Sequence, residues 1–311
     1  MTAVEPWPRE ALISALQARF PLWQDEALLV TPLAGGITNQ NFKVSAAGQH
    51  FVLRVCSPAV SLLGIDRHVE LQCSQAAATA GVTPEVIGSF ADLPGGKQAL
   101  ITRYVAGRPL AAEDLRAPQR LPAVVKLIRR YHGLHQFAGR FDVFRTVADG
   151  LAFCRQRSVP LPSWIDELNH RLYEITLAVR RRQLPQAACH NDLLSGNFLQ
   201  QADGRLWLVD WEYAGWGDLF FDLGNLAVNN EFGDAEDELL LSLYCGERTA
   251  ADLAHLKLMK LVSDVREGVW GLIQTQLSTL EFDYLAYGLR HLERFRQNSS
   301  HPSVAEWLAL L

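Results

Sequence analysis

The sequence lacks the features that mark several classes of protein. Its five cysteines are odd in number and form no C-x-x-C pair, which argues against a disulfide framework or a cysteine-based metal site. We therefore expect reduced, mostly buried thiols in a cytoplasmic protein. No apolar run approaches the length of a membrane-spanning helix, so no membrane partner is predicted. The N-terminus has no basic stretch followed by an apolar one, so we predict no signal peptide.

The charge balance also lacks an excess of basic residues. Lysine and arginine number 29 against 34 acidic residues, giving a net charge of −5. A nucleic-acid partner usually needs a basic face, so none is predicted. Hydrophobic residues make up 49% and charged residues 20% of the 311 residues, proportions typical of a globular protein with a sizeable core. The length suggests one large or two modest domains.

One motif carries the chemistry. Residues 190–197 read H-N-D-L-L-S-G-N, the H-x-D-x-x-x-x-N spacing of a kinase catalytic loop, and a turn and an apolar strand then end on Asp210. Phosphoryl transfer needs an acceptor for the substrate hydroxyl proton and oxygen ligands for Mg²⁺. We predict Asp192 as the catalytic base and Asn197 and Asp210 as the Mg²⁺ ligands. A lone H-x-D is often just a turn, but the combination with the following strand and carboxylate favours catalysis.

A nucleotide site is predicted in the first third of the chain. Residues 34–44 place two glycines and a polar turn between two strands; such a hairpin can lay backbone N–H groups over phosphates, although an ordinary turn is the alternative. Kinases pair a strand lysine with a helix carboxylate. Here the strand 49–55 offers Arg54 and the helix 67–80 offers Glu70; the alternatives are a surface cation and a solvated helix residue. A hinge at 103–107 would face an adenine edge. The predicted nucleotide-binding residues are Gly36, Thr38, Asn39, Asn41, Arg54, Glu70 and Tyr104.

The order of elements predicts two parts. A five-stranded sheet with one or two helices is expected up to residue 106, and mainly helices from 107 to 311. We predict that Asp222, which begins an apolar run, bonds the catalytic-loop backbone or caps a helix. Ser163 opens a capping-box pattern at the start of a helix over 163–182, and the acidic residues 231–238 indicate the first turn of another helix.

The chain resembles the choline/ethanolamine kinase branch of the aminoglycoside phosphotransferase–like kinases. The resemblance rests on G-G-I-T-N-Q-N-F (35–42), F-V-L-R-V (51–55), the catalytic loop, V-D-W-E-Y-A-G (209–215) and F-D-L-G-N-L-A-V-N-N (221–230). It implies an α+β, bilobal protein-kinase-like fold with a small antiparallel-sheet lobe and a larger helical lobe. It also implies ATP with Mg²⁺, a small hydroxylated acceptor, and the same roles for Asp192, Asn197 and Asp210. Arg54 falls where most kinases have lysine.

The acceptor is predicted to be a small cationic alcohol, most simply choline or ethanolamine. Aromatic faces attract ammonium groups and carboxylates assist; the alternative is that a chain with eight tryptophans places some in any core. Thiamine, an amino sugar or an aminoglycoside remain alternative acceptors, and a catalytically silent binding protein remains a further alternative. No Phe-Gly follows Asp210 and no Ala-Pro-Glu is present, which argues against a protein kinase. The oligomeric state stays open. The predicted acceptor residues are Asp192, Glu212, Tyr213, Trp216, Glu267 and Trp270.

Overall fold

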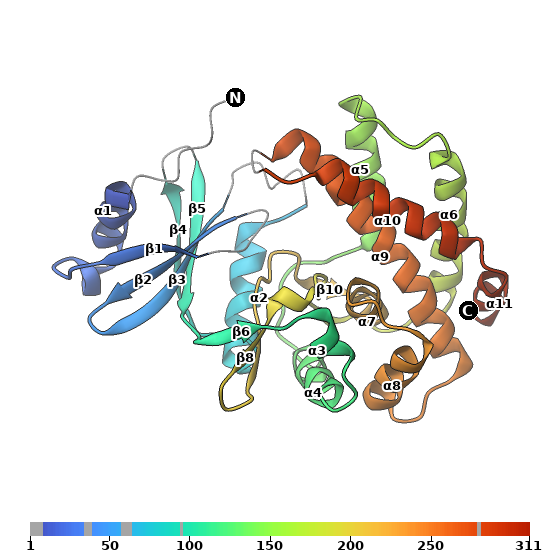
Figure 1. Cartoon of the computed structure of the whole chain (residues 1–311), viewed down its shortest axis with the longest axis horizontal. Coiled ribbons are helices and arrows are strands. Elements are labelled where there is room, and N and C mark those ends of the chain that lie inside the picture. The colour runs from blue at the N-terminus through green and yellow to red at the C-terminus, as the bar shows by residue number, and fades with distance from the viewer. Residues whose placement is uncertain (1–8, 34–38, 57–63, 94–95, 279–280) are drawn as a thin grey trace.

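The computed structural model describes residues 9–33, 39–56, 64–93, 96–278 and 281–311 (Figure 1). The predicted phosphate-binding residues Gly36 and Thr38 lie outside these ranges. Within the described ranges, no helix combines the length and apolar character needed to cross a bilayer.

The N-terminal part is built on a five-stranded antiparallel sheet, as predicted. Its spatial order is β1-β2-β3-β5-β4. Every second residue of β2 is buried, because successive side chains on a strand point to opposite faces. Leu12 and Leu16 of the first helix pack into the same core as the sheet. The elements are α1 (Arg9–Arg19), β1 (Leu29–Leu33), β2 (Gln40–Ala46), β3 (Gln49–Cys56), α2 (Arg67–Thr79), β4 (Val86–Leu93) and β5 (Lys97–Arg103).

The C-terminal part is mainly helical (Figure 1). The long helix α9 is packed against α5, α7, α10 and α11, and it is buried almost all round between residues 254 and 274. The helices of the C-terminal part are α3 (Ala112–Arg116), α4 (Leu121–His132), α5 (Val143–Gln156), α6 (Ile165–Arg181), α7 (Leu219–Asn229), α8 (Asp234–Cys245), α9 (Ala250–Leu277), α10 (Tyr284–Ser299) and α11 (Ser303–Leu310).

Short strands carry the catalytic motif between these helices. They are β6 (Gly107–Pro109), β7 (Ala187–Cys189), β8 (Phe198–Gln201), β9 (Leu206–Leu208) and β10 (Gly215–Gly217). Three of them form a sheet in the order β6-β8-β9, and β7 pairs with β10 in a separate two-stranded sheet. The β8–β9 hairpin therefore joins the end of the catalytic loop to the segment that contains Asp210.

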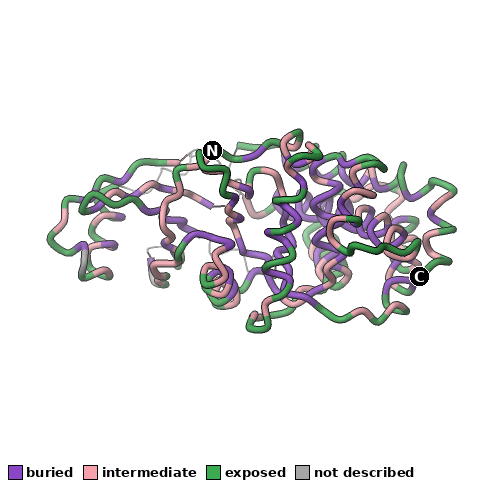
Figure 2. Tube along the Cα trace, turned by 90° about the horizontal axis from the view of Figure 1, so that it is seen from below, coloured by how far each residue is buried: buried purple, intermediate pink, exposed green. Residues whose placement is uncertain are grey.

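The buried side chains form two clusters, one around the five-stranded sheet and a larger one among the helices. Figure 2 shows the dense buried region of the helical part. Cys73 and Ala77 of α2 belong to the larger cluster, so this helix packs toward the helical part although it follows β3 in the chain. We propose two lobes, 1–106 and 107–311, in which α2 of the first packs into the core of the second.

Two predictions about helix starts had different outcomes. The capping box at Ser163 is wrong: α6 begins at Ile165 after Trp164, which makes no side-chain capping hydrogen bond. Ser163 lies one residue too early for its hydroxyl to serve as the cap. The acidic start of α8 is confirmed, since the Gly233 N–H donates to the Glu236 carboxylate at 3.0 Å.

Candidate active site

A cavity of about 620 Å³ is lined by both parts of the molecule. Strands β2, β3 and β5, the 103–109 segment, the catalytic loop, residues 209–213 and helices α9 and α10 contribute side chains to it. It brings together most of the residues predicted for the nucleotide, the metal and the acceptor. These are Asn39, Asn41, Arg54, Tyr104, Asp192, Asn197, Asp210, Glu212, Tyr213, Glu267 and Trp270.

Asp222 of α7 holds the catalytic loop in place through the loop's backbone. Its carboxylate accepts the backbone N–H of His190 at 2.9 Å and that of Asn191 at 2.6 Å. It also accepts from the Tyr131 hydroxyl at 2.7 Å and bonds His132 at 3.0 Å. Burial alone would raise the pKa of Asp222, but these hydrogen bonds and His132 lower it below its ordinary value. The prediction that Asp222 bonds the loop backbone is confirmed.

His190 links the loop to the segment before Asp210. Its Nδ1 accepts the backbone N–H of Asp192 at 3.2 Å, and its Nε2 lies 3.0 Å from the carbonyl oxygen of Val209. Burial lowers the pKa of His190 to about 4, so the ring is neutral near pH 7. A neutral ring has one N–H, and the carbonyl partner assigns that proton to Nε2. His190 therefore fixes the position of Asp192 relative to the segment that contains Asp210.

Asp192 is the buried carboxylate of the loop, with 8% of its surface exposed. Burial raises its pKa, Arg266 acts to lower it, and Glu267, Asp210 and Glu212 act to raise it; together they give a pKa of about 8. A carboxylate whose pKa lies near neutral pH can accept a proton effectively. Geometry and electrostatics thus support the predicted role as a base.

Asn197 and Asp210 offer oxygen atoms suited to Mg²⁺. The Asn197 side-chain N–H groups donate to Asp192, at 2.8 Å to its carbonyl oxygen and 3.3 Å to its carboxylate. Among the described residues no donor reaches the Asn197 Oδ1. The Asp210 side chain is 32% exposed, and its backbone adopts a φ of 68°, a left-handed conformation that is uncommon for non-glycine residues. One amide and one carboxylate oxygen are the hard ligands that Mg²⁺ prefers, so the residues present fit the ion.

Arg54 is a buried, doubly paired arginine. It forms ion pairs with Glu70 of α2 and with Asp210. Only 9% of its side chain is exposed, so the surface-cation alternative is wrong. Strand β2 pairs with β3 so that Asn41 stands opposite Arg54. The predicted strand–helix pairing of Arg54 with Glu70 is present in the structure.

Arg67 was not predicted, and it connects two of the predicted carboxylates. Its Nη1 donates to Glu70 at 2.6 Å and to Glu212 at 3.1 Å. Asn39 also donates to Glu212, at 3.1 Å. No local motif in the sequence indicated these contacts, because their partners lie 145 and 173 residues apart in the chain.

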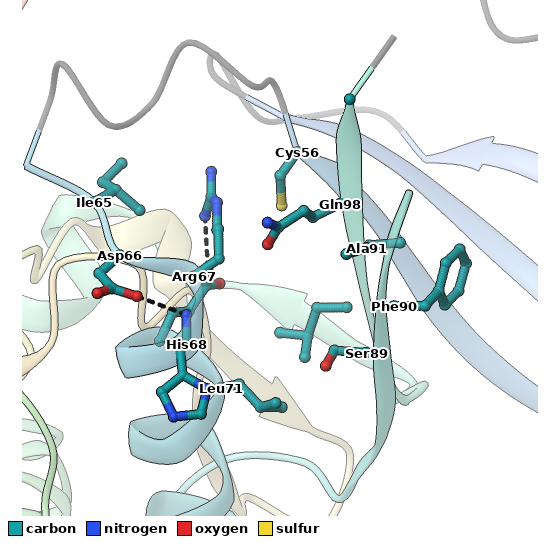
Figure 3. A pocket seen from close by; sticks show the side chains of 14 residues that line it. Cys56, Ile65, Asp66, Arg67, His68, Leu71, Ser89, Phe90, Ala91 and Gln98 are labelled. Carbon is teal, nitrogen blue, oxygen red and sulfur yellow. Dashed lines mark hydrogen bonds and ion pairs between the residues drawn. The ribbon is translucent and has the colours of Figure 1, made fainter. Parts of the chain in front are cut away.

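Glu70 lines a different cavity, of about 610 Å³, between the first turn of α2 and strands β4 and β5. Figure 3 shows Arg67, at the start of the helix, across the cavity from Gln98 and Ala91 of the strands, while Asp66 caps the helix through the His68 N–H. Glu70 is not among the described residues that line the main cavity, so it reaches the candidate active site only through Arg54 and Arg67.

The wall beside Asp192 comes from α9 and α10. Trp270 donates its indole N–H to the Tyr213 hydroxyl at 3.0 Å, and Tyr287 donates its hydroxyl to Glu267 at 2.8 Å. The helices approach so closely that a Cβ on Gly271 would lie 2.8 Å from the Gly288 Cα. Tyr287, which sequence reasoning missed, is next to this crossing. In the sequence, Gly271 in α9 and Gly288 in α10 could have indicated that the two helices cross closely here.

Arg266 was also missed and is the central cation of this wall. Its Nη1 lies 2.6 Å from the Glu267 carboxylate and 3.4 Å from the Asp192 carboxylate. Its guanidinium stands 4.2 Å from the centre of the Tyr213 ring. Trp216, in contrast, is not among the described residues of the cavity; it lies on β10 and donates to the Phe137 carbonyl at 2.9 Å.

Comparisons with known proteins identify the family to which this fold and sequence belong. The model of the "Phosphotransferase enzyme family" matches residues 29–256. A choline/ethanolamine kinase family protein from Mesorhizobium loti has a crystal structure that superposes with a TM-score of 0.79, at 31% identity over 95% of this chain and 96% of that one. The probable choline kinase 3 of Arabidopsis thaliana is 25% identical over 93% of this chain and 92% of its own length. Mouse ethanolamine kinase 2 is 26% identical over 92% and 80%.

The fold and the match to the family model define a phosphotransferase. The chain belongs to the phosphotransferase enzyme family, in its choline/ethanolamine kinase branch. The predicted α+β kinase-like fold is confirmed, and the family uses ATP. Its substrates are small molecules.

Proposed function

We propose that this protein transfers the γ-phosphoryl group of ATP to the hydroxyl of a small cationic alcohol, choline or ethanolamine. The observation that carries the proposal is the single cavity that joins Asp192, Asn197 and Asp210 to an aromatic and acidic wall. The names of the relatives support the same acceptors, since they include choline kinases and an ethanolamine kinase.

In the proposed reaction the acceptor oxygen bonds to the γ-phosphorus, and the bond from that phosphorus to the β–γ bridging oxygen breaks to release ADP. The hydroxyl proton passes to the carboxylate of Asp192, which is held by Asn197 and by the backbone hydrogen bond to His190. Arg54 and its strand neighbour Asn41 would position the phosphates. The oxygens of Asn197 and Asp210 would hold Mg²⁺, which when bound neutralises charge on the phosphate oxygens.

The acceptor would lie against Tyr213 and Trp270. Both rings line the cavity beside Asp192, and aromatic faces attract an ammonium group. Tyr104 and the backbone of the 103–107 segment line the same cavity, where an adenine ring would be placed. The nucleotide and acceptor would thus meet at Asp192 and Asp210.

The test is Mg²⁺-dependent ATP consumption across a panel of choline, ethanolamine, thiamine, an amino sugar and an aminoglycoside. Turnover of choline or ethanolamine alone would support the proposal. Turnover of thiamine or a sugar would keep the phosphotransferase and overturn the acceptor. An Asp192→Asn variant run on the same panel separates true transfer from contaminating ATPase activity.

A further inference from the structure

Arg266 stands where a cationic acceptor would be expected to bind. Three groups could recognise an ammonium group here: the Glu267 carboxylate, the face of the Tyr213 ring and the carboxylate of the proposed base Asp192 itself. The Arg266 guanidinium contacts all three, at 2.6 Å, 4.2 Å and 3.4 Å respectively. The protein's own cation therefore fills the site that the acceptor's cation needs.

The guanidinium is not fully satisfied in this position. Its Nη2 is buried and has no hydrogen-bond partner among the described residues, although the side chain is only 4% exposed. A buried donor without a partner costs free energy. The unpaired Nη2 therefore offsets part of the free energy that Arg266 gains from Glu267 and Asp192.

The structure also contains space next to Arg266. A cavity of about 170 Å³ borders Tyr213, Trp270 and Arg266 on the side of α5. Asp149 of α5 is another of its lining residues and supplies a carboxylate. A guanidinium that left Glu267 could enter this side cavity and approach that carboxylate.

We propose that Arg266 is a specificity-determining residue, an internal cation that the acceptor's ammonium group must displace from Glu267 and Tyr213. The inference rests on the proposed function, because it assumes a cationic acceptor. It means that an acceptor binds only where its own cation replaces the guanidinium on these two residues. A neutral alcohol of the same shape gains no such contact.

The experiment measures binding of the bare cations tetramethylammonium and methylammonium by calorimetry, with Mg²⁺ and a non-hydrolysable ATP analogue present. Arg266→Met removes the competing charge and leaves Glu267 without its cation. We expect the Kd of both cations to fall about tenfold, a change of ~1.4 kcal/mol. The neutral choline isostere 3,3-dimethylbutan-1-ol should show no change.

Two controls sharpen the result. Arg266→Lys keeps the charge and should bind the cations as the wild type does. Arg294→Met removes an arginine from another buried carboxylate of α9, Asp264, which Arg294 contacts at 2.8 Å, and should leave cation binding unchanged. If Arg266→Met does not fold, Arg266→Gln tests the same loss of charge while keeping a donor for Glu267.

An unchanged or raised Kd for the cations in Arg266→Met and Arg266→Gln would overturn the proposal. If the guanidinium competes with the added cation, its removal must strengthen binding of that cation. These probes carry no hydroxyl and need no turnover. A failure of the wild type to phosphorylate any cationic alcohol would therefore overturn the proposed function separately, whatever the outcome for Arg266.

Discussion

The catalytic loop and the charged side chains around it are held in place by different kinds of contact. In the loop, the backbone N–H groups of His190, Asn191 and Leu193 donate to buried side chains of α7, at 2.9, 2.6 and 2.5 Å. Around the loop, arginine and carboxylate side chains of β3, α2, α9 and the segment 210–212 pair with one another, and we call them the charged network. The pairs are Arg54 with Glu70 and Asp210, Arg67 with Glu70 and Glu212, and Arg266 with Glu267 and Asp192.

This difference separates positioning from ligand exchange. A backbone N–H bound to a buried carboxylate has one favourable geometry, and no ligand of the proposed reaction resembles it. An arginine–carboxylate pair has partners that a phosphate or an ammonium group can replace. The loop should therefore keep its geometry during the reaction, while the charged network changes partners as the ligands enter.

The largest expected effect comes from the one loop side chain that would meet both ligands. Asp192→Asn removes the proton acceptor but leaves the loop's backbone hydrogen bonds in place. We expect kcat to fall about 10²–10⁴-fold, the usual contribution of a general base, with nucleotide affinity unchanged. Steady-state kinetics and nucleotide titration measure the two quantities, and wild-type turnover would remove Asp192 from the role of base.

The charged network should be the part that loses stability when a charge is removed. Arg54→Met leaves Asp210 without its cation and leaves Glu70 with Arg67 alone, and breaking a buried pair costs about 3–5 kcal/mol of unfolding free energy. Arg103→Met is the matched control on the same sheet, since its pair with Glu85 is 37% and 65% exposed and should cost about 0–1 kcal/mol. Urea denaturation compares them. Equal losses would contradict a special role for the buried pair.

The same comparison explains what could be predicted from the sequence. The loop residues lie within eight positions and carry their chemistry in a fixed spacing, so Asp192 and Asn197 were identifiable without the fold. Asp222 was identifiable because a carboxylate at the start of an apolar run must find donors. Arg54 and Glu70 were found because each occupies a recognisable strand or helix.

The wall could not be predicted to the same extent. Helix α9 is buried on nearly all sides, so hydrophobic periodicity gave no preferred face and Arg266 had no reason to be selected. The contact of Tyr287 with Glu267 depends on the crossing of α9 and α10. Trp216 and Trp270 were both predicted to line the acceptor site, and only the tertiary structure shows that Trp270 lines the cavity and Trp216 does not.

A loop residue should also make stability depend on pH. Burial lowers the pKa of His190 from its ordinary value of 6.5 to about 4. Between these values the unfolded chain binds more protons than the folded one, so stability is lost as pH falls from about 6.5 to 4. The difference between these two pKa values corresponds to at most about 3–4 kcal/mol.

His190→Gln tests this linkage, because the variant cannot take up the proton. Denaturation at several pH values between 4 and 7 should show a slope that is shallower by up to one proton than in the wild type. Identical slopes would mean that His190 does not titrate differently in the folded and unfolded chains, and the neutral ring assigned to the loop would be wrong.

The smallest expected effect distinguishes two tryptophans that the sequence treats alike. Trp270→Ala removes an aromatic face from the acceptor side of the cavity and should raise KM for the cationic acceptor about 2- to 30-fold, the equivalent of ~0.5–2 kcal/mol, with KM for ATP unchanged. Trp216→Ala, whose ring lies on β10 outside the cavity lining, should leave both KM values as in the wild type. If Trp216→Ala raised the acceptor KM and Trp270→Ala did not, the acceptor would bind near β10, and the wall of α9 and α10 would have no part in its recognition.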